Sequence, residues 1–490
     1  MTSLFSSFQS PGVRVIESTF GARALEITPF QNVYMVGSAS TGDYLTPTQV
    51  TSLADFTNQF GASPSEASVK LFFRNDRNGI LYFVRTPIAP RSLVSVESVG
   101  AGAYTVTING TAVTYTAVGG DDEADIVSGL IDAINQSAVA NVVTASTTGV
   151  VTDSLVIRND NPLSTAATIT VTGNLSVADA TPTQPTAVDY IYAIENSFDV
   201  EDEYPQGFLI APQAFQLLTV QSDRTSVGAA MEQLASDKSF DWIALVDAGA
   251  NLTVTEAQTE GLLYNSPQGH TSFYYPYLTD LEDGTVPASA GVAGVATRRF
   301  KTEGLQQPAA GSKFPVLGVK DVTVKVNTQQ QDTLNPLGIN VIRNLRNKGV
   351  VVWAMRTRSN SEFYRFMPTR VIMNVLNGTL RRGFDNELFS SIDGFGIFLN
   401  NIAATARSVC SRFWRNRLLF GATEADAFEV KCDFENNPRA ELENGNVLCE
   451  VYVVPSPVME KILISTIRVS IGTLPLVQPS SNQFLEDPAI

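Results

Sequence analysis

Residues 334–357 read LNPLGINVIRNLRNKGVVVWAMRT, and GVVVWAMRT (349–357) within this stretch predicts a buried strand. The same stretch opens a basic segment inside an acidic chain. Residues 343–417 hold 13 Lys and Arg against 4 Asp and Glu, which gives +9, while the whole chain carries −16 and the remainder therefore −25. A local excess of this size predicts a positive face that meets a negatively charged partner.

The composition is that of a globular protein. At 490 residues, 44% hydrophobic and 17% charged, the chain is long enough for several domains and too apolar to be a disordered polymer. No uncharged apolar run approaches the roughly 18 residues needed to cross a bilayer. The N-terminal residues show no basic segment followed by a hydrophobic stretch, so we expect no secretory signal and assembly in a cytoplasm.

No residue pattern indicates an enzyme or a metal protein. The chain has one histidine, His270, and three cysteines, Cys410, Cys432 and Cys449, whose spacings match neither zinc nor redox motifs. We expect the thiols to be buried and His270 to be structural. No phosphate-binding loop, complete dinucleotide-binding motif or nucleophile elbow occurs. The sequence therefore predicts no catalytic residues, no cofactor and no metal ion.

Changes in composition along the chain indicate a multidomain protein of the α/β and α+β classes. Strand and helix patterns alternate around 65–85 and again after 186, which predicts an α/β domain. Between them Val, Thr, Ser and Ala dominate, acidic residues exceed basic ones by eight, and one helix is predicted at 123–136. The predicted parts are an N-terminal strand arm (1–25), an α/β domain (26–91 and 186–330), a β-rich exposed insert (92–185), a mixed C-terminal domain (331–461) and a C-terminal strand and tail (462–490).

A long amphipathic helix is predicted at 394–417. At about 100° per residue, one face carries Arg407, Arg412 and Arg415 and the opposite face carries apolar residues. The apolar set is Phe395, Phe398, Leu399, Ile402, Ala406, Val409 and Phe413.

This cationic face has three interpretations: a solvated surface, a nucleic-acid groove, or a docking face for an acidic protein. The basic excess extends over several elements, which a solvated surface does not require. The aromatic residues available for base stacking lie largely at core spacings, and the acidic chain as a whole disfavours nucleic acid. We therefore favour a protein partner and no direct contact with nucleic acid.

Two terminal segments alternate like strands but have no evident partner within the chain. The first comprises Val13, Arg14, Val15, Ile16 and Glu17, and the second contains Ile464, Ile467, Val469 and Ile471. Isolated strands of this kind suit strand addition, in which main-chain hydrogen bonds join one chain to another.

Several motifs, taken in their order along the chain, resemble those of one family. They are SPGVRVIE (10–17), SFYYPYL (272–278), PASAGVAGVATRRF (287–300), LNPLGINVIR (334–343), GVVVWAMRT (349–357), FMPTRVIMNVLNGTL (366–380) and LLFGATEADAFEVKCDFENNP (418–438). The chain resembles contractile tail sheath proteins of bacteriophages and related contractile injection systems. The resemblance covers the arm, the α/β part and the C-terminal third, and leaves 92–185 as an insert.

The resemblance implies a mechanical function. Sheath subunits form a homo-oligomer of stacked hexameric rings in helical array around an inner tube protein, with baseplate and tail terminator proteins as further partners. They exchange terminal strands and contract to drive the tube through a cell envelope. The C-terminal domain would then lie against the tube, with Arg407, Arg412 and Arg415 facing an acidic tube surface. The expected location is a virion tail or a cytoplasmic contractile injection particle.

A function of another class also fits the β-rich insert. A monomeric surface-binding or adhesin-like protein would use residues 92–185 for recognition and would need no terminal strand exchange. The two hypotheses differ in assembly state, since a sheath protein forms long hollow tubes and the alternative forms isolated particles.

Overall fold

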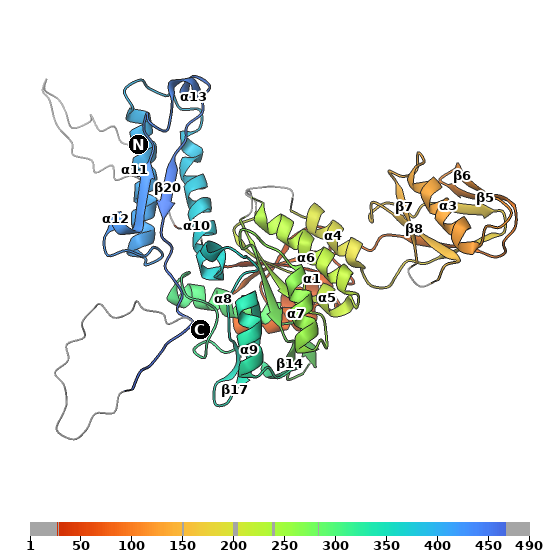
Figure 1. Ribbon diagram of the computed structural model, residues 1–490, viewed down its shortest axis with the longest axis horizontal. Coiled ribbons are helices and arrows are strands. Elements are labelled where there is room, and N and C mark those ends of the chain that lie inside the picture. The colour runs from red at the N-terminus through yellow and green to blue at the C-terminus, as the bar shows by residue number, and fades with distance from the viewer. Residues whose placement is uncertain are drawn as a thin grey trace, which may run out of the picture. The chain divides into compact units, whose positions relative to one another are not determined.

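The computed structural model describes residues 27, 29–148, 151–198, 204–237, 241–282 and 284–466 (Figure 1). The chain divides into a large unit, Met1–Val458, and a short C-terminal unit, Met459–Ile490. The strand predicted at 13–17 lies outside the described residues, as do Ile467, Val469 and Ile471.

An eight-stranded sheet forms the centre of the large unit. Its inner neighbours are parallel, and the strand at each edge is antiparallel to the strand beside it. The inner strands β1, β11, β12 and β13 are buried at every position, which explains their unbroken apolar runs. In spatial order the strands are β18 (Gly349–Val352), β17 (Ile339–Leu345), β13 (Thr271–Tyr275), β12 (Ile243–Asp247), β11 (Gly207–Ile210), β1 (Asn32–Gly37), β3 (Ile80–Arg85) and β2 (Thr48–Val50).

Helices cover both faces of this sheet and create two hydrophobic clusters (Figure 1). Alternate residues of β1 separate them: Val33 and Met35 belong to one cluster, Tyr34 and Val36 to the other. The first cluster includes α1 (Leu53–Phe60), α2 (Glu66–Asn75) and α8 (Ser289–Glu303). The second includes α4 (Ala187–Asn196), α5 (Pro212–Leu217), α6 (Gln221–Ser236), α7 (Val254–Leu263) and α9 (Thr328–Leu334), which η1 (Asn335–Leu337) follows. The predicted α/β domain is thus a doubly covered, mostly parallel sheet.

The small residues of α8 allow it to pack closely against α2. A side chain at Gly294 would lie 2.7 Å from the Cβ of Asn75 and 2.8 Å from the carbonyl oxygen of Phe72. The start of α8 lies beside the buried Asp247, whose carboxylate accepts hydrogen bonds of 2.8 Å from the main-chain N–H groups of Ala288 and Ser289. This carboxylate therefore fixes the first turn of α8 to the end of β12.

A small antiparallel sheet lies in the segment between β13 and β17. It is ordered β15 (Thr285–Val286), β14 (Leu278–Asp280) and β16 (Val319–Val322). Arg74 of α2 reaches this sheet, and its Nη1 donates to Asp280 at 2.9 Å.

The insert has two antiparallel sheets, one helix and a hydrophobic cluster of its own. The sequence predicted this β-rich composition and a helix at 123–136, and the structure has α3 at Glu123–Asn135. One sheet is ordered β10 (Leu175–Asp179), β4 (Arg91–Val96), β8 (Ser154–Asn159) and β7 (Val143–Thr147). The other is ordered β6 (Thr111–Ala117), β5 (Gly102–Ile108) and β9 (Ile169–Thr172).

The two connections of the insert are joined by one buried carboxylate. Asp189 accepts a 2.9 Å hydrogen bond from Arg91 Nη2 and a 3.1 Å bond from the main-chain N–H of Ala89. It also accepts bonds of 2.8 Å from the main chain and hydroxyl of Thr186. Residues on both sides of the insert are therefore held at the same point.

The predicted domain boundary at residue 331 does not separate two domains at the central sheet, because strands on both sides of it belong to that sheet. β17 and β18 follow it, yet both belong to the eight-stranded sheet, because β17 pairs in parallel with β13. The C-terminal elements begin only after η2 (Glu362–Tyr364). They are α10 (Met367–Phe384), η3 (Asp385–Glu387), α11 (Ile397–Arg415), α12 (Glu424–Ala427), β19 (Phe428–Lys431), α13 (Arg439–Glu443) and β20 (Glu450–Val453).

In the short C-terminal unit, described residues 459–466 have no regular secondary structure. Ile464 is 77% exposed there. The strand predicted around it is thus not formed within the described part of this single chain. Among the described residues, no helix is both long and apolar enough to span a bilayer.

Candidate interaction surface of the C-terminal region

The helices α10 and α11 form the framework of the C-terminal region. Their buried residues, among them Val371, Val375, Ile402, Val409 and Phe413, join the hydrophobic cluster on one face of the central sheet. Asp393 stabilises the start of α11, since its carboxylate accepts main-chain hydrogen bonds from Phe395 (2.7 Å), Ile397 (3.1 Å) and Phe398 (2.6 Å). These bonds, that of Phe398 most of all, hold the pKa of Asp393 below its usual value.

The first half of α10 is bonded to the central domain. Asn374 is fully buried, and its Nδ2 donates to the main-chain carbonyl of Asp241 at 2.7 Å. Its side-chain Oδ1 accepts a 2.5 Å bond from Arg370 Nε. Its main-chain carbonyl accepts a 2.5 Å bond from Gln206 Nε2. Every polar atom of the Asn374 side chain is thus engaged, which ties the helix to the segment before β12.

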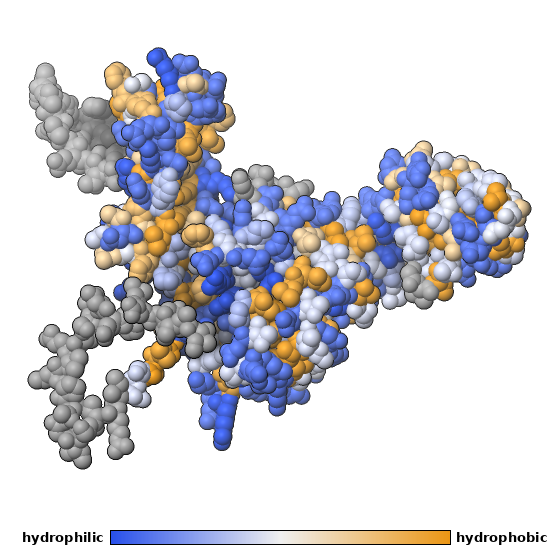
Figure 2. All heavy atoms as spheres, in the orientation of Figure 1, coloured by the Kyte–Doolittle hydropathy of each residue, from blue (hydrophilic) through white to orange (hydrophobic). Residues whose placement is uncertain are grey.

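Large apolar side chains remain exposed around the α10–α11 connection and the β19–β20 sheet. We call this set the apolar surface: Leu388, Phe389, Phe395, Ile397, Phe420, Phe434, Leu448, Tyr452 and Val454, each between 47% and 106% exposed. Figure 2 shows hydrophobic residues gathered over this region. Exposed clusters of this kind indicate a protein interaction site.

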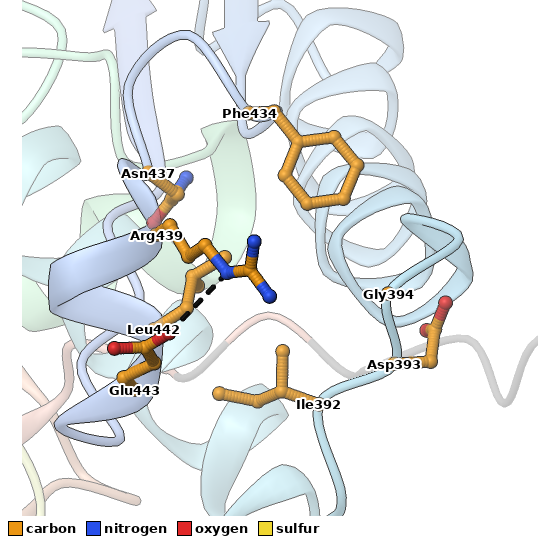
Figure 3. Close-up of a pocket in the computed structure, with 8 residues that line it drawn as sticks. All are labelled: Ile392, Asp393, Gly394, Phe434, Asn437, Arg439, Leu442 and Glu443. Atoms are coloured by element: carbon orange, nitrogen blue, oxygen red, sulfur yellow. Dashed lines mark ion pairs between the residues drawn. The ribbon is translucent and has the colours of Figure 1, made fainter.

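The apolar surface is hollowed by open cavities. One of about 720 Å³ lies between Ile392, Phe434 and Leu442 (Figure 3). In that view Arg439 extends between these side chains and forms an ion pair with Glu443 at 3.3 Å, while Asp393 points away. A neighbouring cavity of about 410 Å³ is lined by Phe384, Leu388, Phe389, Phe398, Ile402, Val447 and Cys449 among others. Apolar residues line both cavities, but the first also has Asp393, Arg439 and Glu443 in its lining, whereas the second has Glu387.

The prediction for the apolar face of the long helix is largely confirmed. Leu399, Ile402, Ala406, Val409 and Phe413 are buried, and Phe398 packs partly against them. Phe395 is the exception, with 89% of its surface exposed. The helix starts only at Ile397, after Gly396 in the left-handed conformation, so Phe395 does not share the helical periodicity.

The β19–β20 sheet has two strands within the described residues, so each strand has one unpaired edge. The Val454 N–H donates to the Ala427 carbonyl, so the main-chain groups of Ala427 point toward the strand that contains β20. Because these groups point to opposite sides at successive residues, those of Val430 point away from β20. Arg407 Nη2 donates to the Val430 carbonyl at 3.1 Å. One group at this outer edge is thus already bonded by a side chain from α11.

The three predicted tube-facing arginines have different surroundings. Arg407 is bonded to β19, as above, and Arg412 is half-buried. Arg415 is 73% exposed, and its Nη2 lies 3.9 Å from Glu424. Arg412 and Arg415 are in the last turn of α11, where positive charge also stabilises the helix terminus. Arg415 and Arg417 line an open cavity of about 670 Å³ together with Phe420.

The basic segment 343–417 does not form one continuous positive face, contrary to the prediction from its charge. Arg356, Arg358 and Arg370 are each at most 8% exposed. Their guanidinium groups serve internal contacts; Arg358 Nε, for example, donates to the Tyr264 carbonyl at 3.3 Å. Net charge summed along a sequence includes such buried groups, so it overstates the charge presented to a partner.

The described residues offer little for catalysis. His270 is 1% exposed, its Nδ1 lies 2.8 Å from the Trp242 carbonyl oxygen, and burial lowers its pKa to about 4. A cavity of about 240 Å³ beside α6 contains Glu232, whose pKa burial raises to about 7, with no His or Cys among its described lining residues. Within the described ranges, no group of three His, Cys, Asp or Glu side chains could hold a metal ion.

Comparison with known proteins relates this architecture to sheath proteins. Residues 180–358, which contain strands β11, β12, β13, β17 and β18 of the central sheet, match the phage tail sheath protein central domain. A tail sheath protein of Burkholderia phage BcepMu is 23% identical over 91% of this chain and 94% of that protein. The chain is similar to tail sheath proteins. A second sheath protein, from Vibrio phage KVP40, is 22% identical over 62% of this chain and 42% of its own length.

Solved structures of other sheaths have the same fold. The helical sheath of the anti-feeding prophage in its contracted state matches with a TM-score of 0.58 and 17% identity, over 94% of this chain and 99% of that chain. The sheath complex of the extracellular contractile injection system PVC, also contracted, gives a TM-score of 0.57 and 16% identity, over 94% and 98%. The predicted mixed α/β class with several sheets is confirmed at that level.

Sequence reasoning missed the apolar surface. Leu388, Phe389 and Phe395 lie in FDNELFSSIDGFGIF (384–398), where polar residues and glycines interrupt any helical period. Large apolar residues in a segment so rich in loop-forming residues were the available signal.

Proposed function

We propose that this chain is the structural subunit of a contractile tail sheath, which polymerises as stacked rings around an inner tube and contracts to drive the tube through a cell envelope. The observation that carries the proposal is the β19–β20 sheet, whose outer edges have no partner strand among the described residues and which lies beside exposed apolar side chains. The sheet packs against α11 through β19, and further strands could extend it at its edges by main-chain hydrogen bonds. This sheet is therefore the proposed acceptor for strands of neighbouring subunits.

The proposed donors are the terminal segments. Near the N-terminus Val13 and Val15 flank Arg14, and near the C-terminus Ile467, Val469 and Ile471 alternate with polar residues. A donated strand would satisfy main-chain groups along an edge of the acceptor sheet and cover part of the apolar surface. Mutual donation would join rings into a mesh that stays connected while its subunits move as rigid bodies.

The same proposal assigns a surface to the inner tube. Arg412 and Arg415 lie in the last turn of α11, and Arg415 lines an open cavity and is mostly exposed. We infer a salt-sensitive contact with an acidic tube surface, because exposed charge pairs are screened by ions. The ends of the sheath would meet baseplate and terminator proteins, and the insert would point outward. The particle would be a phage tail or a contractile injection device.

Electron microscopy of the purified protein tests the assembly. A sheath subunit forms long hollow tubes, whereas a monomeric surface-binding protein gives isolated particles. Val15→Pro removes a main-chain donor from the proposed strand, so we expect it to prevent long tubes. Ser7→Pro, outside the predicted strand, is the matched control and should still assemble. Tubes of normal length from Val15→Pro would contradict strand donation by this segment.

A further inference from the structure

Cys432 and Cys449 lie opposite each other at one end of the β19–β20 sheet. Lys431 pairs with Glu450 in the antiparallel register, so the next pair along both strands is Cys432 with Cys449. The two side chains are close enough for a hydrogen bond between their thiols. Hydrogen-bonded and non-hydrogen-bonded residue pairs alternate along an antiparallel sheet. Lys431 and Glu450 form a hydrogen-bonded pair, so the two cysteines form a non-hydrogen-bonded pair, in which opposite Cα atoms are about 4.5 Å apart. That separation is within the range that a disulfide spans.

Two asparagines hold the two cysteine-bearing segments together. Asn437 is 1% exposed; its Oδ1 accepts from the Leu448 N–H at 2.6 Å and its Nδ2 donates to the Leu448 carbonyl at 2.9 Å. Asn436 Nδ2 donates to the Lys431 carbonyl at 3.0 Å. The residue before each cysteine is thus fixed by side-chain bonds, which keeps the thiols in register without a covalent link.

The three thiols differ in exposure. Cys410 is fully buried on α11, and burial raises its pKa to about 12. Cys432 is 3% exposed and its pKa is likewise raised to about 12 by burial, whereas Cys449 is partly exposed and lines the cavity of about 410 Å³. Arg407 lies near enough to favour the thiolates of Cys432 and Cys449. A small reagent therefore reaches Cys449 first.

We propose that Cys432 and Cys449 are a site of oxidative cross-linking that closes the end of the β19–β20 sheet with a disulfide. The oxidant is a low-molecular-weight disulfide. The Cys449 thiolate attacks one of its sulfurs, forms a mixed disulfide and releases one small thiol. The Cys432 sulfur then attacks the Cys449 sulfur, loses its proton to water, and releases the second small thiol. Two protein thiols are oxidised, and one small disulfide is reduced to two thiols.

The folded protein is tested by incubation with oxidised glutathione at pH 8.5, followed by alkylation of free thiols and tryptic mapping without reduction. Trypsin cleaves after Lys431, Arg439 and Lys461, so the expected product joins peptide 432–439 to peptide 440–461. Peptide 408–412, which carries Cys410, should be recovered alkylated. Reaction should be faster at pH 8.5 than at pH 7, because the thiolate is the nucleophile.

Other products would overturn the proposal. These are a link through Cys410, recovery of all three cysteines in alkylated form, or glutathione retained on Cys449 without a cross-link. Cys410→Ser should leave the yield of the 432–439 link unchanged, and Cys449→Ser should abolish it. The same reaction in concentrated urea is a control for cross-linking that does not depend on the fold. In the unfolded protein, disulfides should form between more than one pair of cysteines. The cross-linked protein should also melt at a higher temperature than the reduced protein, since the closed loop restrains the unfolded chain.

Discussion

Arg407 on α11 donates a 3.1 Å hydrogen bond from Nη2 to the main-chain carbonyl of Val430 on β19. This bond joins the longest C-terminal helix to the outer edge of the two-stranded sheet. The arginine predicted from sequence to face a partner is thus engaged within its own chain. Among the three arginines of α11, Arg407 therefore supports the acceptor sheet, Arg412 is half-buried, and Arg415 is 73% exposed.

Replacement of Arg407 by Ala should lower the free energy of unfolding by about 1–2 kcal/mol, because a main-chain acceptor loses a charged donor. Arg415→Ala is the matched control. Its side chain is 73% exposed and its nearest acidic atom is 3.9 Å away, so its loss should cost less than about 0.5 kcal/mol. Urea denaturation followed by circular dichroism measures both. Equal losses from the two substitutions would show that the Val430 bond contributes nothing specific.

Reversal of charge at Arg412 and Arg415, each to Glu, should detach the sheath from its tube while rings still stack. The reason is like-charge repulsion from an acidic tube surface. The measurement is sedimentation of co-assembled sheath and tube over a range of salt concentrations. Arg346→Glu with Lys348→Glu makes the same charge change at exposed positions of the β17–β18 hairpin and serves as control. Normal tube-bound sheaths from the α11 variant would refute the proposed tube contact.

Deletion of residues 92–185 should leave a soluble protein that still forms tubes. Arg91 and Thr186 flank the deletion, and Arg91 Nη2 already donates to the Thr186 hydroxyl, so a two-glycine link can join them. The insert has its own hydrophobic cluster, and its removal leaves both clusters of the central domain intact. Electron microscopy reports the tubes, and thermal melting reports the remaining fold. A soluble, folded variant that forms no tubes would show that the insert takes part in assembly.

Glu232 should make the central domain less stable as pH rises. Burial raises its folded-state pKa from 4.5 to about 7, against the opposing hydrogen bonds from Thr271 and Ser266. Between these two values the folded state binds more protons than the unfolded state, so stability falls from pH 4.5 to 7 and is constant above, a loss of up to about 3 kcal/mol.

Glu232→Gln removes this titration. Relative to the unmodified chain, the variant should gain stability as pH is raised from 5 to 8, as measured by urea denaturation at each pH. Glu256, exposed on α7, supplies the control Glu256→Gln, because hydrogen bonds from Thr253 lower its pKa and its titration ends at acidic pH. Parallel pH profiles for Glu232→Gln and the unmodified chain would exclude Glu232 as the cause.

Asn374→Ala should destabilise the attachment of α10 by about 2–4 kcal/mol. The change removes the donor to Asp241 and leaves buried acceptors and the Arg370 guanidinium without their partner. Asn400→Ala, at an exposed position of α11, should change stability by less than about 0.5 kcal/mol. Denaturation in urea compares them, and similar small effects from both would mean that Asn374 is not an anchor.

The sequence predicted the parts of this fold that depend on local periodicity. The buried strands 80–85 and 349–352, the helix at 123–136 and the apolar face of α11 follow from patterns that tertiary contacts reinforce. The boundary at 331 was misplaced because sheet membership depends on the pairing of β17 with β13, which are more than 60 residues apart in sequence. No local pattern contains that information.

The candidate surface was less accessible to prediction. Charge along the chain singled out Arg407, Arg412 and Arg415, but it gave the same weight to Arg370, which is bonded inside the protein. Which strand edges lack a partner and which phenylalanines stay exposed depend on contacts between segments far apart in the sequence. Local sequence patterns do not contain that information. The strand arms remain a prediction, since their residues lie largely outside the described ranges.

Helix α10 gives the molecule a stiff lever. Its 18 residues extend about 27 Å, with Asn374 bonded to the central domain near its middle and the partner helix α11 packed against it. A continuous helix has no hinge, so a force applied to the acceptor sheet passes to the central domain without being absorbed by a flexible joint. Subunits joined through that sheet would therefore turn as whole bodies, and the work of one ring would reach the next through helical backbone.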